Sequence, residues 1–154
     1  MALNRAKIGA VYPTSESYEV SREKIKEYAR AIKDENPAYF DPEVAKQLGH
    51  PDVIAPPSFA MIISLEAERQ VVHDPDMWAR DQVKFVHREQ RFTYRRPIVA
   101  GDIITATVRV ANITAIGDND VAVFETTIAT PEGEHVCTAH ATFVMYAPAE
   151  GAAP

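Results

Sequence analysis

The chain has 154 residues, a length that fits one domain with a substantial apolar core. Its formal net charge of −6 and its pI near 5.3 argue against a nucleic-acid partner, because phosphate binding requires a concentrated basic surface. No apolar run approaches the roughly 20 residues of a membrane-spanning helix, and the first residues do not resemble a signal peptide. We therefore expect a cytoplasmic protein without membrane contacts. Cys137 is the only cysteine, which excludes an intramolecular disulfide.

Helical signals occupy the first part of the chain. A short strand is expected over residues 17–20, after which Ser21 can cap a helix. The apolar positions of this helix recur with helical spacing at Ile25, Tyr28, Ala29 and Ile32. Pro37 forces it to end near residues 33–35. A second, short helix is predicted over residues 42–48, with Gly49 ending it.

A third, strongly apolar helix is predicted to begin at Ser58. The sequence from Phe59 to Leu65 is apolar on nearly every side of such a helix and turns polar only at Glu66 and Glu68. A helix of this kind is expected to be buried at its N-terminal end.

From about Val83 the apolar pattern alternates, and further β-rich stretches follow over residues 103–116, 121–130 and 135–146. The breaks at 117–120 and 131–134 have the composition of hairpin connections, so the last three strands are predicted to form an antiparallel meander. The segment 96–102 is too rich in Pro and Gly for a strand. Helices followed by strands indicate an α+β domain, in which a curved antiparallel sheet wraps around the central apolar helix. This single domain is expected to cover residues 1–146, and 147–154 to form a flexible C-terminal tail.

The loop after the first helix carries a chemical motif. Asp34, Asn36 and Pro37 followed by Tyr39 resemble the Asp-x-Asn-Pro-x-His signature of MaoC-like hydratases and dehydratases. These are hot-dog-fold enzymes that move water across the double bond of an acyl thioester. Tyr39 occupies the position of the histidine and, with an ordinary pKa of about 10, is a poor general base at neutral pH. The alternative is that these residues only terminate a helix.

A second family landmark is an Ala-His-Gly-Met-like stretch, where a backbone N–H at the start of the buried helix polarises the thioester carbonyl. Here the stretch reads Ala55-Pro56-Pro57-Ser58-Phe59, and Pro57 at the glycine position has no N–H. The N–H of Ser58 or Phe59 is the candidate replacement. The resemblance implies substrate contacts at Pro56, Pro57, Ser58, Phe59 and Ile62. Proline as a simple helix start is the alternative.

Residues 86–102 resemble the second half of MaoC-like domains. Within them His87, Glu89 and Arg91 lie two residues apart and are expected to project from one face of a strand. His87 oriented by Glu89 would form an acid/base pair able to replace the missing histidine. Mixed charge on an exposed strand without any function is the alternative. No Gly-rich phosphate loop or metal-ligand cluster appears, so neither a cofactor nor a metal is expected.

Taken together, these motifs resemble small MaoC-like N-terminal, or FAS1-like, dehydratase-domain proteins. In that group a subunit with an altered motif pairs with an intact one to form the (3R)-hydroxyacyl-carrier-protein dehydratase of fatty-acid synthesis. The resemblance implies an acyl-ACP or acyl-CoA substrate, a hot-dog partner that supplies the acid and the base, and an acyl-binding role for this chain. The alternatives are a self-sufficient homodimeric hydratase using His87 and Glu89, or a non-enzymatic acyl-thioester-binding module. A thioesterase is disfavoured because Glu66 and Glu68 follow the apolar run.

Overall fold

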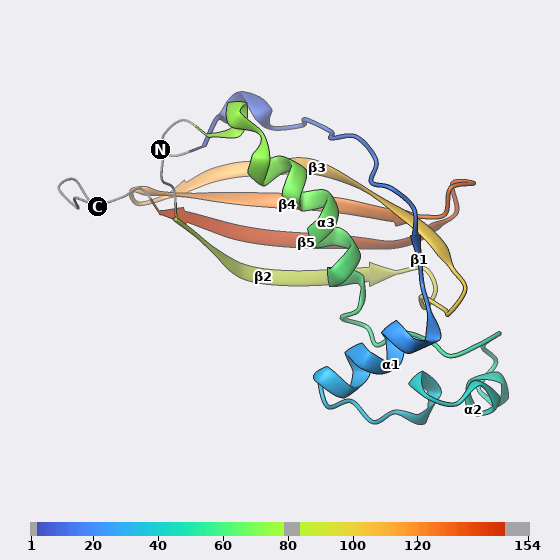
Figure 1. The fold of residues 1–154 in the computed structure, drawn as a ribbon. Coiled ribbons are helices and arrows are strands. Elements are labelled where there is room, and N and C mark those ends of the chain that lie inside the picture. The colour runs from blue at the N-terminus through green and yellow to red at the C-terminus, as the bar shows by residue number, and fades with distance from the viewer. Residues whose placement is uncertain (1–2, 79–83, 147–154) are drawn as a thin grey trace.

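The fold is a single curved antiparallel sheet with one long helix across its concave face (Figure 1). It was obtained as a computed structural model, which describes residues 3–78 and 84–146. The strands lie in the order β1-β3-β4-β5-β2. Their bounds are β1 Tyr18–Glu19, β2 Lys84–Tyr94, β3 Ile103–Ile116, β4 Asn119–Ala129 and β5 His135–Tyr146. This arrangement confirms the predicted α+β class, in which a curved sheet wraps around a central helix.

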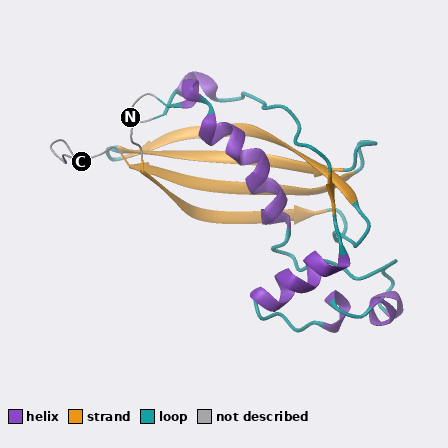
Figure 2. Cartoon of the chain, viewed as in Figure 1, coloured by secondary structure: helices purple, strands orange, loops and turns teal. Residues whose placement is uncertain are grey.

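Two of the three α-helices gather at one end of the sheet (Figure 2). The helices are α1 Arg22–Ala31, α2 Pro42–Gln47 and α3 Ala60–His73, with 3-10 turns at Arg5–Lys7, Pro37–Tyr39 and Pro75–Met77. As predicted, the Ser21 side chain caps α1 by accepting the Lys24 N–H at 3.1 Å. Ile25 is buried but Ile32 is 43% exposed, because the helix ends at Ala31 and no longer directs residue 32 inward.

The central helix α3 differs from its prediction at both its start and its buried surface. It begins at Ala60 rather than Ser58, because residues 57–59 form a turn. Its buried positions run along the whole helix, namely Ala60, Ile63, Ser64, Ala67, Glu68 and Val71, whereas Leu65 is 37% exposed. The expected burial at the N-terminal end is confirmed, and it extends further along the helix than the sequence predicted. Because α3 lies across the concave face of the sheet, the sheet covers one side of the helix along its whole length (Figure 1).

The predicted antiparallel meander of β3, β4 and β5 is confirmed. The connection between β3 and β4 is shorter than predicted, because only Gly117 and Asp118 lie outside the strands. Gly117 has φ of 59°, a conformation that glycine adopts at little cost. Asp120 belongs to β4, and its carboxylate accepts the Leu3 N–H at 3.0 Å.

The edge strand β2 contains a bulge that corrects a prediction about the site. His87 is paired with Phe143 of β5, and Glu89 is paired with the next residue, Thr142, so the register shifts at Arg88. Neighbouring residues of β5 point to opposite faces of the sheet. His87 therefore lies on the inner face, where its ring stacks on Phe143 at 4.6 Å, and Glu89 lies on the outer face. The expectation that both residues share one face was wrong.

Two predictions concern residues at the limits of the described chain. The flexible tail proposed for 147–154 lies outside the described residues, as does Val83, where the first long strand was expected to begin. Among the helices of the described ranges, none has both the length and the apolar character required to cross a membrane.

Candidate functional site

A cavity of about 350 Å³ lies where the loop after α1, the approach to α3 and the end of β2 meet. We call it the Tyr39–Tyr94 cavity, and it is lined by Tyr39, Ile54, Ala55, Pro57, Tyr94, Arg95, Arg96 and Pro97. Its volume lies within the range of small-molecule sites, about 300–1,000 Å³. The altered motif loop and the proline-led helix start, which are distant from β2 in sequence, thus share one cavity.

The motif loop starts from a left-handed residue. Lys33 has φ of 59°, its N–H donates to the Arg30 carbonyl at 3.1 Å, and the Asp34 N–H donates to the Ala29 carbonyl at 2.9 Å. This pair of bonds is a Schellman motif with lysine where glycine is usual. It turns the chain sharply, so that Asp34 leaves the helix axis and begins the loop.

Within the loop, Asp34 and Asn36 support the backbone. The Asp34 carboxylate accepts the Asn36 N–H at 3.2 Å, and the Asn36 side chain accepts the Ala38 N–H at 3.0 Å. Tyr39 is only 5% exposed. Burial and the nearby charge of Asp34 raise the pKa of Tyr39, while a hydrogen bond with Asn36 opposes them. The phenol therefore stays protonated at neutral pH and cannot serve as the base that histidine would be.

At the start of α3, one predicted donor is available and the other is occupied. The Phe59 N–H donates to the Pro56 carbonyl at 2.9 Å, and the Phe59 side chain is fully buried, packed edge-on against Tyr28. The Ser58 N–H donates to no atom in the described part of the chain. Of the two candidates, Ser58 is therefore the residue that can offer a backbone donor to a carbonyl.

Tyr94 completes the cavity, and sequence reasoning did not select it. Its hydroxyl donates to the Pro57 carbonyl at 2.6 Å. Burial raises the pKa of Tyr94 well above its usual value, so it remains a donor throughout the neutral range. The signal available in the sequence was its alternation with Phe92, which places both residues on the inner face of β2.

The two arginines at the rim differ in their partners. The Arg96 guanidinium donates to Asp102 and Glu134, each at 2.7 Å, and is fixed by them. The Arg95 side chain is exposed and makes no hydrogen bond or ion pair within the described residues. Arg95 is therefore the cation that the cavity can present to an anionic group.

The family is decided by a match over most of the chain. Residues 6–139 match the family model described as "FAS1-like, dehydratase domain region". The chain belongs to the FAS1-like dehydratase family. A protein named UPF0336 from Saccharopolyspora erythraea is 47% identical over 97% of this chain and 96% of its own length. The predicted resemblance is confirmed.

Solved structures agree with the family. One is a chain of the complex "C terminal truncated HadBC (3R-Hydroxyacyl-ACP Dehydratase)" from Mycobacterium tuberculosis, with 28% identity and a TM-score of 0.80 over 90% of this chain and 96% of that chain. Another, a "MaoC-like dehydratase", has 31% identity and a TM-score of 0.86 over 94% of this chain but 43% of that chain. The predicted hot-dog fold is thereby confirmed, as is the membership of a dehydratase-type family.

The predicted acid/base pair of His87 and Glu89 does not form in this FAS1-like chain. His87 Nε2 lies 3.1 Å from the backbone oxygen of Glu89, not from its carboxylate. That carboxylate binds Arg91 at 2.8 Å, a hydrogen bond that lowers the pKa of Glu89. His87 and Tyr94 are seven residues apart on β2, which separates them by roughly 23 Å at about 3.3 Å per residue. The pair therefore brings no proton-transfer group to the cavity.

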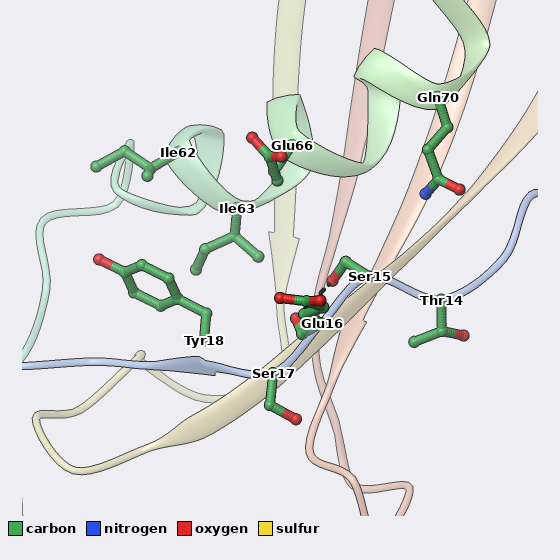
Figure 3. A pocket seen from close by; sticks show the side chains of 9 residues that line it. All are labelled: Thr14, Ser15, Glu16, Ser17, Tyr18, Ile62, Ile63, Glu66 and Gln70. Carbon is green, nitrogen blue, oxygen red and sulfur yellow. Dashed lines mark hydrogen bonds between the residues drawn. The ribbon is translucent and has the colours of Figure 1, made fainter. Parts of the chain in front are cut away.

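Ile62, predicted to contact the substrate together with Pro57, lines a different cavity. This second cavity, of about 540 Å³, lies between residues 14–18 and α3 (Figure 3). Ile62 and Ile63 face it from the helix, whereas its other lining is largely polar, namely Thr14, Ser15, Glu16, Ser17, Tyr18, Glu66 and Gln70. The predicted substrate-binding set is therefore divided. Pro57 lines the Tyr39–Tyr94 cavity, Ser58 follows it in the chain without lining the cavity, and Pro56 is buried.

Glu68 is a buried carboxyl that the sequence reasoning placed outside the apolar surface of the helix. It is 2% exposed, and one oxygen accepts the Thr126 hydroxyl at 3.4 Å, while the other has no partner in the described residues. Burial raises the pKa of Glu68 to about 7. It lines neither cavity described above. Within the described ranges, no three His, Cys, Asp or Glu side chains gather at a place that could hold a metal.

Proposed function

We propose that this chain is the substrate-binding subunit of a heteromeric (3R)-3-hydroxyacyl-thioester dehydratase of fatty-acid synthesis. The observation that carries the proposal is the content of the Tyr39–Tyr94 cavity. Its lining residue Pro57 shares a peptide unit with Ser58, whose N–H donates to no atom in the described chain and could serve a carbonyl. Tyr39, the only side chain that the motif loop contributes to the lining, is a phenol with a raised pKa. Such a cavity can bind an acyl thioester but lacks the base for its α-proton.

The dehydration itself requires groups that this cavity does not supply. A base must remove the α-proton of the 3-hydroxyacyl thioester, and an acid must protonate the hydroxyl as it leaves as water. We assign both steps to a second hot-dog chain with an intact Asp-x-Asn-Pro-x-His loop. This chain then contributes carbonyl binding and an apolar wall that includes Ile54, Ala55 and Pro97.

The free edge of the sheet supports the choice of a hot-dog partner. β2 is paired only with β5 in the described sheet, so its other side has unpaired N–H and C=O groups (Figure 1). Apolar side chains on this strand are unusually exposed, with Phe85 at 45% and Val86 at 52%. The HadBC relative is by its name a complex, and an antiparallel contact along β2 would cover these groups here.

The thioester is proposed to be carried by ACP or CoA, since both end in a phosphopantetheine arm. Arg95 at the rim is the residue available to its phosphate. The self-sufficient alternative based on His87 and Glu89 is not retained, because the bulge places these residues on opposite faces of β2.

The test is the hydration of a trans-2-enoyl-CoA, followed by the loss of enoyl absorbance. The protein is assayed alone and then with a hot-dog chain that carries the intact motif. Activity only in the mixture, exceeding that of the partner alone, is the expected result. Activity of this chain alone would refute the division of labour. Binding without turnover in either assay would instead identify a non-enzymatic acyl-thioester-binding module.

A further inference from the structure

Two tyrosine hydroxyls hold two successive peptide carbonyls at the start of α3. Tyr94, at the end of β2, donates to the Pro57 carbonyl at 2.6 Å. Tyr28, on α1, donates to the Ser58 carbonyl at 3.0 Å. Phe59, the residue that precedes the helix, provides no side-chain cap. The orientation of the peptides that open the helix is therefore fixed from outside by side chains of two other elements.

The Tyr94 bond fixes a specific N–H direction. The Pro57 carbonyl and the Ser58 N–H belong to one planar peptide unit, and the described chain contains no cis peptide bond. In a trans peptide these two groups point in opposite directions. A hydroxyl held on the Pro57 oxygen consequently sets the direction of the Ser58 N–H, which donates to no atom in the described chain.

The same bond also makes this N–H a better donor. A hydrogen bond accepted by a peptide carbonyl polarises the whole unit, and such chains of bonds strengthen one another by roughly 10–30%. Burial is the main cause of the raised pKa of Tyr94, and the backbone of Ala60 and the thiol of Cys137 also contribute to the electrostatic surroundings of its hydroxyl. The Tyr94 hydroxyl at the end of β2 is thus held against the start of α3 by its bond to the Pro57 carbonyl.

We infer that Tyr94 is a positioning residue that, through the Pro57–Ser58 peptide, aims and strengthens the Ser58 N–H as the donor to a bound thioester carbonyl. This inference rests on the proposed function, since it requires the Tyr39–Tyr94 cavity to bind an acyl thioester. Pro57 removes the N–H of its own residue, and the tyrosine makes the next N–H along the chain suitable for the same task.

Tyr28 provides a matched control within the same turn. Its hydroxyl acts on the Ser58–Phe59 peptide, whose N–H is already donated to the Pro56 carbonyl at 2.9 Å. Tyr28 does not line the Tyr39–Tyr94 cavity. Tyr28→Phe and Tyr94→Phe each remove one hydroxyl that binds a peptide carbonyl, and the two peptides are adjacent. Only the peptide bound by Tyr94, Pro57–Ser58, carries an available N–H.

The experiment uses octanoyl-CoA with ¹³C at the thioester carbonyl, a saturated probe that cannot undergo hydration. Its carbonyl chemical shift and its affinity are measured with the full chain, alone and with the motif-bearing partner. The wild-type protein is expected to move the carbonyl signal downfield. Tyr94→Phe is expected to lose at least about half of that shift and to weaken binding about three- to tenfold, the effect of losing one hydrogen bond. Tyr28→Phe should keep the wild-type shift.

The outcomes separate this inference from the proposed function. If the wild-type protein binds no octanoyl-CoA in either form, the proposed function fails. If Tyr94→Phe binds the probe with the full wild-type shift, the positioning role fails while the binding role stands. Should Tyr94→Phe not fold, 3-fluorotyrosine at position 94 retains the ring and provides a more acidic hydroxyl. A larger downfield shift would then support the inference, and an unchanged shift would overturn it.

Discussion

Replacing Glu68 with glutamine is expected to stabilise the fold at pH 8 and to leave it nearly unchanged at pH 4. Glu68 lies on the buried stripe of α3, 2% exposed, with one carboxylate oxygen unpartnered among the described residues. Ionising it there places a charge in an apolar core, where only the Thr126 hydroxyl at 3.4 Å and the Ser64 hydroxyl lower its pKa and burial outweighs them. Glutamine keeps the size and the acceptor oxygen but cannot ionise.

The magnitude follows from the pKa of Glu68, which burial raises from 4.5 to about 7. A folded-state pKa above the unfolded one means that the folded protein binds the proton more tightly. The associated stability is complete below about pH 4.5 and is lost as the pH rises through about 7. A shift of about 2.5 units at 1.36 kcal/mol per unit gives about 3 kcal/mol as the upper limit. We expect Glu68→Gln to recover about 1–3 kcal/mol at pH 8.

The measurement is the free energy of unfolding by urea between pH 4 and pH 8, taken as the difference between variant and wild type. The difference cancels titrations that both proteins share. Glu66→Gln is the matched control, because Glu66 is exposed on the same helix and paired with Arg69 at 3.3 Å. A difference for Glu68→Gln that is constant across this pH range, or equal to that of the control, would refute a buried carboxyl with a raised pKa.

Three further predictions concern the motif loop and the cavity rim. Lys33→Gly should raise the free energy of unfolding in urea by about 0.5–1 kcal/mol, because glycine relieves a left-handed φ of 59°, and a decrease would contradict this. Arg95→Ala should weaken octanoyl-CoA binding about three- to tenfold, because it removes a rim cation that has no partner among the described residues. Binding is measured by calorimetry, and the control Arg88→Ala, at the β2 bulge, should leave the affinity unchanged. Asp34→Asn should leave enoyl hydration by the reconstituted complex within a few-fold of wild type, because asparagine can still accept the Asn36 N–H. A loss of about a hundredfold would place proton transfer on this chain.

Local signals in the sequence specified most of the fold. Ser21 marks the start of α1, and the alternating strands with their turns define the meander, since each signal depends on residues close in sequence. The bulge at Arg88 had no such signal. An extra residue in a strand does not change its composition, and it becomes visible only when β2 is aligned with β5. The proposed His87–Glu89 pair failed for this reason.

The site could be predicted in part because two family motifs retain their positions. Tyr39 and Pro57, each named from the sequence, line the same cavity. Their third neighbour, Tyr94, could not be assigned its role, because its bond to Pro57 joins residues 37 positions apart. The distinction between the Ser58 and Phe59 N–H groups also depends on the turn at 57–59, whereas the sequence pattern predicts that the helix begins at Ser58.

Under the proposed function, the two changes in the family motif affect different parts of the reaction. Tyr39 in place of histidine removes proton transfer, because its phenol has a raised pKa. Pro57 in place of glycine removes one N–H, but the adjacent Ser58 N–H remains available. A site that binds a carbonyl without moving protons interacts similarly with substrate and product, so its binding energy lowers KM without lowering the chemical barrier. In a heteromeric complex, variants of the Tyr39–Tyr94 cavity should therefore change KM more than kcat, and variants of the partner's loop should do the opposite.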